Sequence, residues 1–219
     1  TNVLIRRQLL ETLDTPIQLL LVEAISGAGK RTLLTQWGSE AGDEHRIVVD
    51  ASKAPPTRQG IASLIGSELS RGSERRLCSA KLSRESLPED LLRGLAGLTR
   101  PVAVGILATD RLQTEAVDFL LEAIEAASQL RLVVTGADLA CFRSAVQGRP
   151  LAFANLGDRD LFLTPDELRQ IIASHGITPT ERNTTALLRS THGHVGMVEA
   201  AITQRSEEHT SELQSRLHL

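Results

Sequence analysis

Cysteine is scarce in this sequence: Cys78 and Cys141 are the only two, and they lie far apart. Because neither has a neighbour at the spacing of metal ligands, neither a disulfide framework nor a zinc site is predicted. Long apolar runs are also missing. The longest two, residues 17–25 and 101–108, fall well short of the roughly 20 residues that a membrane-spanning helix needs. We therefore expect no membrane segment and no secretory signal, and a cytoplasmic location.

An excess of positive charge is absent too. The net charge is −3 at neutral pH, whereas binding to nucleic acid depends chiefly on basic groups that neutralise phosphates. This chain is therefore predicted not to bind DNA by itself. Of its 219 residues, 41% are hydrophobic and 23% charged, which is typical of a folded protein of one or two domains rather than of a disordered or fibrous chain.

Apolar and amphipathic segments alternate along the first 160 residues. Four short apolar runs have the pattern of strands buried on both faces: residues 17–24, 45–52, 101–110 and 131–138. Helical periodicity occurs over residues 6–13, 31–41, 60–72 and 114–128. Residues 74–89 are polar and predict a loop with some helix. The alternation predicts an α/β fold with a parallel, doubly wound sheet, whose ligands bind beyond the carboxyl ends of the strands.

From about residue 161 the pattern becomes purely helical. Thr164 and Thr178 are each followed by Pro and, three residues on, by Glu, which is the pattern of a capping box with Pro at the first helical position. Gly176 and Gly193 are expected to end the two helices that begin there, and a third helix is expected over 195–204. We predict an α/β domain over residues 1–160 and a small all-helical subdomain over 161–204.

The end of the sequence differs from everything before it. Residues 205–219 contain no Ala, Gly or Val and have no clear apolar face. Residues 205–215 resemble the conceptual translation of a common sequencing-library adapter, so we interpret 205–219 as a non-native or disordered tail. The alternative is a solvated terminal helix or linker. A start without Met likewise suggests a fragment.

Residues 24–32 lie between the first apolar run and the helix that follows, and they have the composition of a phosphate-binding loop. Such a loop uses glycines, successive backbone amides and a helix start to hold an anion, a Lys for the outer phosphates and a hydroxyl for magnesium. The predicted nucleotide-binding residues are Ser26, Gly27, Ala28, Gly29, Lys30, Arg31 and Thr32.

Two positions of this loop depart from the GxxxxGK[ST] pattern. Ala24 replaces the first Gly, and Arg31 stands where the hydroxyl is expected, with Thr32 one residue later. The alternative is a Gly-rich turn that ends in a surface Lys. The order of strand, GxGK and helix favours the nucleotide, and so does the placement of Lys30, one of only three lysines against 21 arginines.

Nucleotide hydrolysis also needs a carboxylate at the end of a neighbouring strand, which holds magnesium and orients the attacking water. The third apolar run ends in Ala108, Thr109 and Asp110, so one acid is present. We predict Asp110 as the catalytic carboxylate and, together with Thr32, as a magnesium ligand. The alternative is that Asp110 merely caps the next helix. Asp50, at the end of the second run, either faces the same site or forms a turn.

With these motifs in view, the chain resembles the ATPase domain of the large ATP-binding LuxR-type transcription regulators, the MalT-like group within the STAND class of P-loop ATPases. The similarity extends from about Val3 to Thr203 and includes AISGAGKRTLLTQW, ILATDRLQTEAVDFLLEAI and the helical segments 161–172 and 180–202. In that family Ala commonly opens the loop, so Ala24 fits the pattern. Thr occupies the position of Arg31, so Arg31 does not.

Three further family features are altered here. The paired acids of the family align with Ala108 and Thr109, which leaves Asp110 one place late. The next strand, which usually ends in Ser-Arg, reads Thr135-Gly136. The Gly-Trp-Pro turn of the helical subdomain reads Gly193-His194-Val195, and we interpret His194, like His192, as a turn residue rather than a metal ligand.

The resemblance implies a regulatory switch that binds ATP or ADP, associates with itself, and contacts DNA only through a carboxyl-terminal helix-turn-helix outside this sequence. Because the chemical positions depart together while the apolar framework is kept, we expect weak or no hydrolysis, and the need for Mg²⁺ stays open. Slow turnover suits a switch, which requires only different affinities of two states for ATP. The second hypothesis is a nucleotide-free interaction scaffold that keeps the P-loop fold. A small-molecule kinase is disfavoured, since we find no acceptor-binding constellation.

Overall fold

The chain divides into two units. The computed structural model describes residues 4, 6–40, 44–71 and 87–204. A sheet unit comprises residues 8–25 and 30–157, and a helical unit comprises the described residues among 1–7, 26–29 and 158–204. The predicted tail, 205–219, and most of the predicted loop, 74–89, lie outside the described residues.

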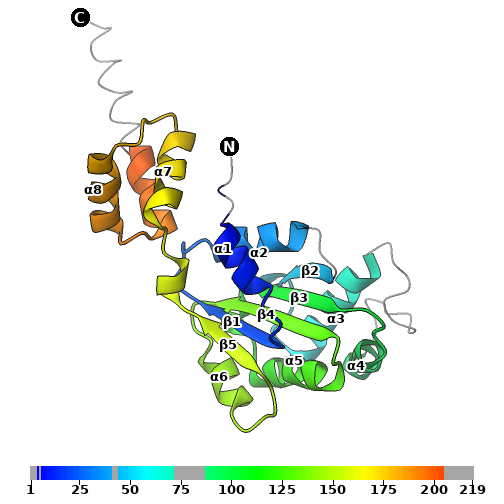
Figure 1. Ribbon diagram of the computed structural model, residues 1–219. Coiled ribbons are helices and arrows are strands. Elements are labelled where there is room, and N and C mark those ends of the chain that lie inside the picture. The colour runs from blue at the N-terminus through cyan, green and yellow to red at the C-terminus, as the bar shows by residue number, and fades with distance from the viewer. Residues whose placement is uncertain (1–3, 5, 41–43, 72–86, 205–219) are drawn as a thin grey trace, which may run out of the picture. The chain divides into compact units, whose positions relative to one another are not determined.

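Five parallel strands form the sheet, in the order β2-β3-β4-β1-β5 (Figure 1). Their bounds are β1 Leu19–Glu23, β2 His45–Asp50, β3 Val102–Leu107, β4 Leu130–Gly136 and β5 Phe153–Leu156. The central strands β3 and β4 are buried along their whole length, as near-continuous Val, Ile and Leu requires. The predicted parallel α/β sheet is confirmed, and its first four strands match the four apolar runs.

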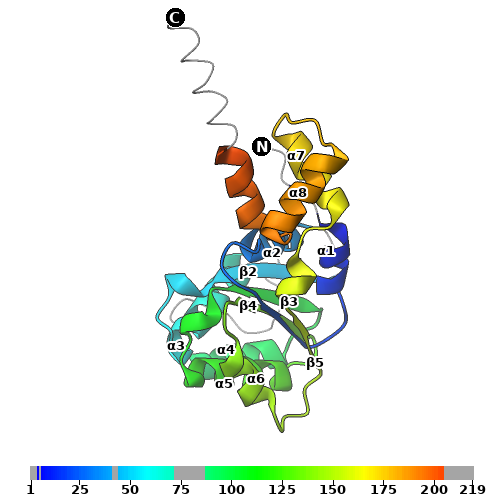
Figure 2. The same ribbon diagram turned by 90° about the vertical axis from the view of Figure 1, so that its left-hand side faces the viewer.

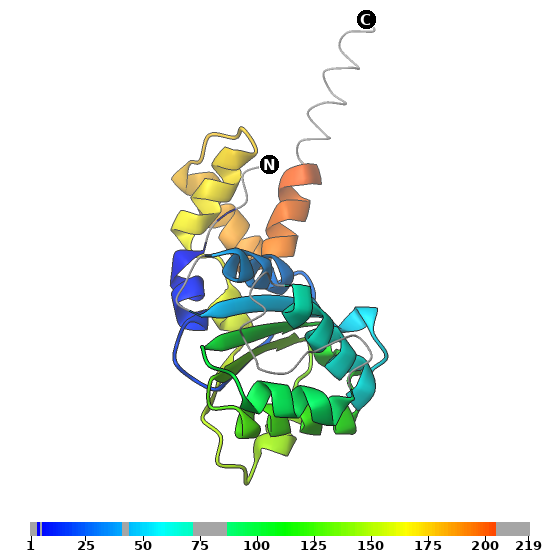
Figure 3. The same cartoon turned by 90° about the vertical axis from the view of Figure 1, so that its right-hand side faces the viewer.

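Helices cover both faces of this sheet, with α1 and α2 on one face and α3 to α6 on the other (Figures 1 and 3). Their bounds are α1 Arg7–Leu13, α2 Lys30–Ser39, α3 Arg58–Arg71, α4 Pro88–Ala96, α5 Thr114–Ala126 and α6 Ala140–Val146. Short 3-10 turns, η1 Ala51–Lys53 and η2 Thr109–Arg111, follow β2 and β3. Since all strands are parallel, the residues after β1, β2, β3 and β4 emerge at one edge of the sheet.

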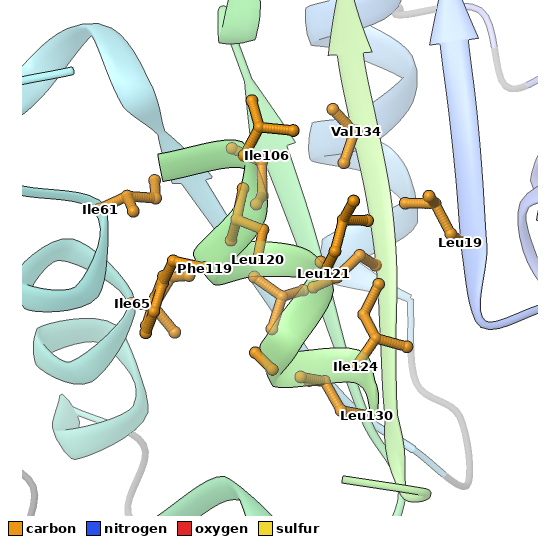
Figure 4. Packing of buried hydrophobic residues seen from close by; sticks show 14 of the residues in the cluster. Leu19, Ile61, Ile65, Ile106, Phe119, Leu120, Leu121, Ile124, Leu130 and Val134 are labelled. Atoms are coloured by element: carbon orange, nitrogen blue, oxygen red, sulfur yellow. The ribbon is translucent and has the colours of Figure 1, made fainter. Parts of the chain in front are cut away.

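The main hydrophobic core lies between the sheet and the helices on the α5 face (Figure 4). Phe119, Leu120 and Ile124 of α5 are fully buried, together with Ile106 of β3 and Val134 of β4. Each such side chain contributes about 1.5–3 kcal/mol relative to full exposure. The core therefore fixes the strand ends at which ligands of such sheets bind.

Two helices and one strand of the sheet unit were not predicted. Helix α4 begins with Pro88 at its first turn and buries Leu91 and Leu95, although part of it falls in the segment that we interpreted as a polar loop. Helix α6 has only seven residues, of which Phe142 and Val146 are buried. Strand β5 has four residues at the edge of the sheet. Helix α6 and strand β5 contain too few buried apolar positions for a period to show.

The helical unit contains α7 (Pro165–Ser174), α8 (Glu181–Thr191), a helix over 195–204 and the 3-10 turn η3 (Asp158–Leu161) (Figure 2). The first capping box is confirmed: the Thr164 hydroxyl accepts from the Glu167 amide at 3.2 Å, and the Glu167 carboxylate accepts from the Thr164 amide at 2.8 Å. Across the described residues, no helix is both long and apolar enough to cross a bilayer.

The predicted start of the second helix was wrong by two residues. The N-cap of α8 is Thr180 rather than Thr178, and its partner is Asn183. The Asn183 side chain accepts from the Thr180 amide at 2.8 Å and donates to the Thr178 carbonyl at 3.1 Å. A carboxylate could not make the second bond, so the amide of Asn183 ties Thr178 outside the helix.

Arg6 bonds the amino-terminal stretch of the helical unit to its η3 turn and α7. Its guanidinium donates to Glu167 at 2.9 Å and to the carbonyls of Leu161 and Phe162 at 2.8 and 2.9 Å. Burial raises the pKa of Glu167, but hydrogen bonds from Arg6 and the Thr164 amide lower it by a larger amount. The pKa of Glu167 therefore lies below the ordinary value of 4.5.

We expect Glu167→Gln to lower the free energy of unfolding by about 1–2 kcal/mol at pH 7, because the charged partner of Arg6 is lost. A depressed pKa stabilises the fold above the ordinary pKa of 4.5, and this contribution disappears as the pH falls from there through the folded pKa. Urea unfolding followed by circular dichroism should therefore show the gap between the two proteins shrinking below pH 4.5. A gap that is constant from pH 7 to pH 3 would contradict the ionic role. Asp166→Asn, at an exposed neighbour, is the control.

Candidate functional site

The loop between β1 and α2 has a backbone of alternating handedness. Gly27 and Gly29 have φ angles of +83° and +87°, whereas Ser26 before them and Ala28 between them do not have positive φ. Alternation of this kind turns successive amides toward one concavity, a nest that binds anions. Within the described chain, the amides of Ser26, Gly27 and Gly29 donate to no protein acceptor. The loop thus has the backbone geometry of an anion cradle, and only Gly adopts those two φ angles without strain.

Lys30 begins α2 directly after this nest. Its ammonium group donates to the carbonyl of Ala24 and, at 2.9 Å, to the carbonyl of Ile25, so it folds back onto the loop that precedes it. The side chain is partly buried at the carboxyl end of β1. An ammonium ion is a compact charge with donors that rotate freely, and it can exchange such partners for phosphate oxygens.

Arg31, at the position of the expected hydroxyl, forms an ion pair with Asp50 at 2.9 Å. The Asp50 carboxylate also accepts from the Ser52 hydroxyl at 2.6 Å and the Ser52 amide at 3.1 Å, and thereby caps η1. Burial raises the pKa of Asp50, but the bonds from Ser52 and Arg31 outweigh it and hold the pKa below the ordinary 3.8. The turn-forming reading of Asp50 is thus correct, and its remaining partner is a cation of the loop.

Thr32 lies exposed on the first turn of α2, one residue after Arg31. Among the residues that the structure describes, no group of three His, Cys, Asp or Glu side chains is placed to hold a metal ion.

Asp110 lies in η2 at the end of β3, and its carboxylate holds the turn that follows β4. One carboxylate oxygen accepts from the amide of Ala137 and, at 3.0 Å, from that of Asp138. Thr109 is fully buried and donates to the Thr135 carbonyl at 3.1 Å. Ala108 adopts a left-handed conformation with φ of 58°. The strand ends β3 and β4 are therefore bonded to each other through Asp110 and Thr109.

The helical unit includes the nest itself, which sequence patterns did not predict. The amide of Gly196 donates to the Gly27 carbonyl at 3.0 Å, and a Cβ on Gly27 would lie 3.0 Å from Cε1 of His194. Beside Gly29, a Cβ would lie 3.6 Å from a methyl group of Val195. The turn 193–196 is therefore hydrogen-bonded to Gly27, and a side chain on Gly27 would force the imidazole to shift, whereas one on Gly29 would only touch Val195.

No protein-family model matches this sequence, and no curated protein matches it. Solved structures do match. The Walker-type ATPase PABY2304 of Pyrococcus abyssi has a TM-score of 0.62 at 16% identity, over 99% of this chain and 75% of that one. The STAND protein PH0952 of Pyrococcus horikoshii, with its tetratricopeptide repeat sensor, has a TM-score of 0.58 at 15% identity, over 88% of this chain and 28% of its own.

The ORC1 protein of Aeropyrum pernix, solved in complex with DNA, has a TM-score of 0.55 at 19% identity, over 88% of this chain and 56% of its own. Likeness at these identities concerns the fold alone. The predicted fold is confirmed: this chain has the α/β fold of P-loop NTPases, with helical parts.

Proposed function

We propose that this chain is the ATP-binding part of a regulatory switch within a longer protein, and that residues 26–32 bind the phosphates of ATP or ADP. The observation that supports this most is the nest at Gly27 and Gly29, whose amides have no protein acceptor among the described residues, followed directly by Lys30. The amides would hold the phosphates and the Lys30 ammonium would neutralise their charge. The shared fold of a Walker-type ATPase and a STAND protein supports a nucleotide as the anion.

We further propose that the longer protein is a LuxR-type transcription regulator. The support is the sequence resemblance over about Val3 to Thr203, which includes the loop, the β3 segment and the helical unit. In such a protein DNA would be contacted by a helix-turn-helix outside this sequence, and ATP would promote self-association. The negative net charge of the present chain agrees with DNA contacts that are made by a segment outside this sequence.

Hydrolysis is proposed to be weak or absent. Asp110 is the proposed catalytic carboxylate, yet its carboxylate accepts from the amides of Ala137 and Asp138. To orient a water molecule it would have to give up those bonds. A switch needs no turnover, because ATP can shift an equilibrium between two states simply by binding one of them more tightly.

Magnesium fits these residues poorly. Thr32 and Asp110 are the proposed ligands, but the hydroxyl position itself holds Arg31, and Asp50 is occupied by Arg31 and Ser52. The Arg31 side chain is 64% exposed, and an exposed ion pair contributes at most about 1 kcal/mol, so it can turn toward a phosphate. We propose that the guanidinium supplies fixed positive charge and that ATP binding does not depend on the metal.

Isothermal titration calorimetry with ATP tests the function, with one series in magnesium and one in EDTA. We expect saturable binding in both series, with dissociation constants that differ by less than about threefold. Failure of millimolar ATP to bind under both conditions would refute the switch. Binding seen only with magnesium would keep the switch, refute the metal-independent form and support Thr32 and Asp110 as ligands.

Arg31→Thr should make ATP binding depend on magnesium. The substitution removes the fixed cation and restores a hydroxyl next to Lys30, so magnesium is expected to tighten binding of this variant about tenfold or more. The same calorimetric titration measures the effect. Thr35→Ser, further along α2 and exposed, should behave as the wild type does. An Arg31→Thr variant that binds ATP equally well in EDTA would contradict the proposed role of Arg31.

The nucleotide-free scaffold is the second candidate, and one observation favours it. Lys30 already donates to two carbonyls of its own loop, so the loop is partly satisfied without a ligand. Partner contacts of such a scaffold would not respond to ATP. The Lys30 variant described in the Discussion separates these two functions.

A further inference from the structure

His194 is a buried imidazole in the turn between α8 and the last helix of the helical unit. Only 7% of the residue is exposed. The turn is held by Gly193, whose φ is +78° and whose carbonyl accepts from the Leu163 amide at 2.8 Å. The His194 amide in turn donates to the Thr191 carbonyl at 2.9 Å. These main-chain bonds fix the place at which the imidazole leaves the backbone.

The hydrogen bonds of this ring determine where its proton lies. Nδ1 of His194 accepts from the amide of Met197 at 3.3 Å. In a neutral imidazole one nitrogen accepts and the other donates, so the proton is on Nε2. Within the described chain Nε2 is buried and has no hydrogen-bond partner. His194 therefore presents a donor that lacks an acceptor, a state that native structures seldom leave unexplained.

This donor lies beside the phosphate loop. Cε1 and Nε2 of His194 are 3.0 and 3.8 Å from the position that a Cβ on Gly27 would take. Residue 27 is at the centre of the nest, and its carbonyl is already bonded to the Gly196 amide. The unpartnered N–H thus lies beside Gly27, one of the loop residues whose amides donate to no acceptor among the described residues. A ligand that satisfies all of these donors must be rich in acceptors and need not donate.

We propose that Nε2–H of His194 donates to a phosphate oxygen of the nucleotide in the loop, which makes His194 a phosphate-binding residue contributed by the helical unit. This inference rests on the proposed function and adds to it a specific residue and a specific part of the ligand. A polyphosphate has the required acceptors, whereas an adenine or ribose does not match a row of donors. Phosphate bound in the loop would then be hydrogen-bonded to the turn 193–196 through the His194 side chain.

The test measures the binding of ATP, inorganic triphosphate and adenosine by calorimetry. For His194→Ala we expect ATP and triphosphate to bind about tenfold more weakly, because one charge-assisted hydrogen bond is lost, and adenosine to be unaffected. His194→Gln, which keeps a side-chain N–H, should recover part of the loss. His192→Asn is the matched control: His192 is exposed, and Asn tolerates its φ of 51°. It should bind all three compounds as the wild type does.

A second measurement needs no substitution. In nitrogen-15 NMR spectra of the wild-type chain, saturating triphosphate is expected to shift the Nε2 signal of His194 and to leave that of His192 in place. Unchanged triphosphate affinity in His194→Ala, or an unmoved Nε2 signal at saturation, would overturn the inference while the ATP-binding function stands. A wild-type chain that binds neither ATP nor triphosphate would refute both.

Discussion

ATP is expected to raise the unfolding temperature of the wild-type chain by roughly 5–10 °C and to leave that of Lys30→Ala nearly unchanged. A ligand present at 100 times its dissociation constant stabilises the native state by about 2.7 kcal/mol, and each kcal/mol corresponds to about 2–4 °C in a chain of this size. Loss of the Lys30 charge should weaken phosphate binding about 100-fold, which leaves only about 0.4 kcal/mol. Differential scanning fluorimetry with and without ATP measures both shifts.

The matched control is Lys53→Ala, which removes an exposed lysine from η1 and should keep the full shift. Each variant is compared with its own unfolding temperature without ATP, because Lys30→Ala also loses two bonds to loop carbonyls. If ATP stabilised Lys30→Ala as much as the wild type, the nucleotide would have to bind somewhere other than the loop. No stabilisation of either protein would favour the scaffold.

Arg131→Met is expected to lower the free energy of unfolding by about 3–5 kcal/mol, the usual effect of removing one partner from a buried ion pair. The Arg131 side chain is 11% exposed and donates to Glu44 and to the carbonyls of Leu13 and Thr15. Its guanidinium lies 5.5 Å from the centre of the Trp37 ring. Methionine can fill the volume, but it removes one of the two arginines that pair with Glu44, the other being Arg46, and it removes the donor to both carbonyls.

Thermal unfolding should show this as a fall of roughly 6–20 °C. Arg93→Met is the control, because the Arg93 side chain is 77% exposed and pairs with Asp90 on the same helix. We expect it to change stability by less than about 0.5 kcal/mol. If Arg131→Met lowered stability no more than Arg93→Met does, the buried contacts of Arg131 would contribute no more than a surface ion pair.

Most of the sheet could be predicted because it is buried on both faces. The runs that became β1, β3 and β4 are nearly continuous in Leu, Val and Ile, since both sides of each strand meet a helix layer or another part of the core. Helix α5 has the regular apolar spacing of a helix with one fully buried face. Strand β5 could not be found in the same way, because half of its side chains face solvent and it lies at an edge.

The sequence predicted one of the two helix caps correctly. Thr164 and Glu167 form the expected reciprocal pair. At the second helix the same sequence pattern pointed to Thr178, but the competing pair of Thr180 and Asn183 prevailed because the Asn amide bonds on both sides of the start. The two capping patterns overlap in the sequence, and residue types alone do not determine which pair forms.

The sequence predicted the backbone conformation of the candidate site but not the contacts of its side chains. GxGK between a strand and a helix indicates the turn, and the structure gives Gly27 and Gly29 the φ angles that such a turn requires. The nucleotide-binding, catalytic and metal-binding roles of residues 26–32 and Asp110 stay predictions. The pairing of Arg31 with Asp50 joins residues 19 positions apart, and the contact of His194 with Gly27 spans most of the chain. No local period encodes either contact.

The helical unit is assembled from three separate stretches of chain, and the shortest of them is the four residues 26–29. A single cut near residue 158 therefore does not separate this protein into two independent modules. The carboxyl-terminal piece would lack the glycines against which its own turn rests, and the amino-terminal piece would keep those glycines without the Gly196 amide that holds one of them. Any dissection of this molecule must leave its phosphate loop and its last three helices on one polypeptide.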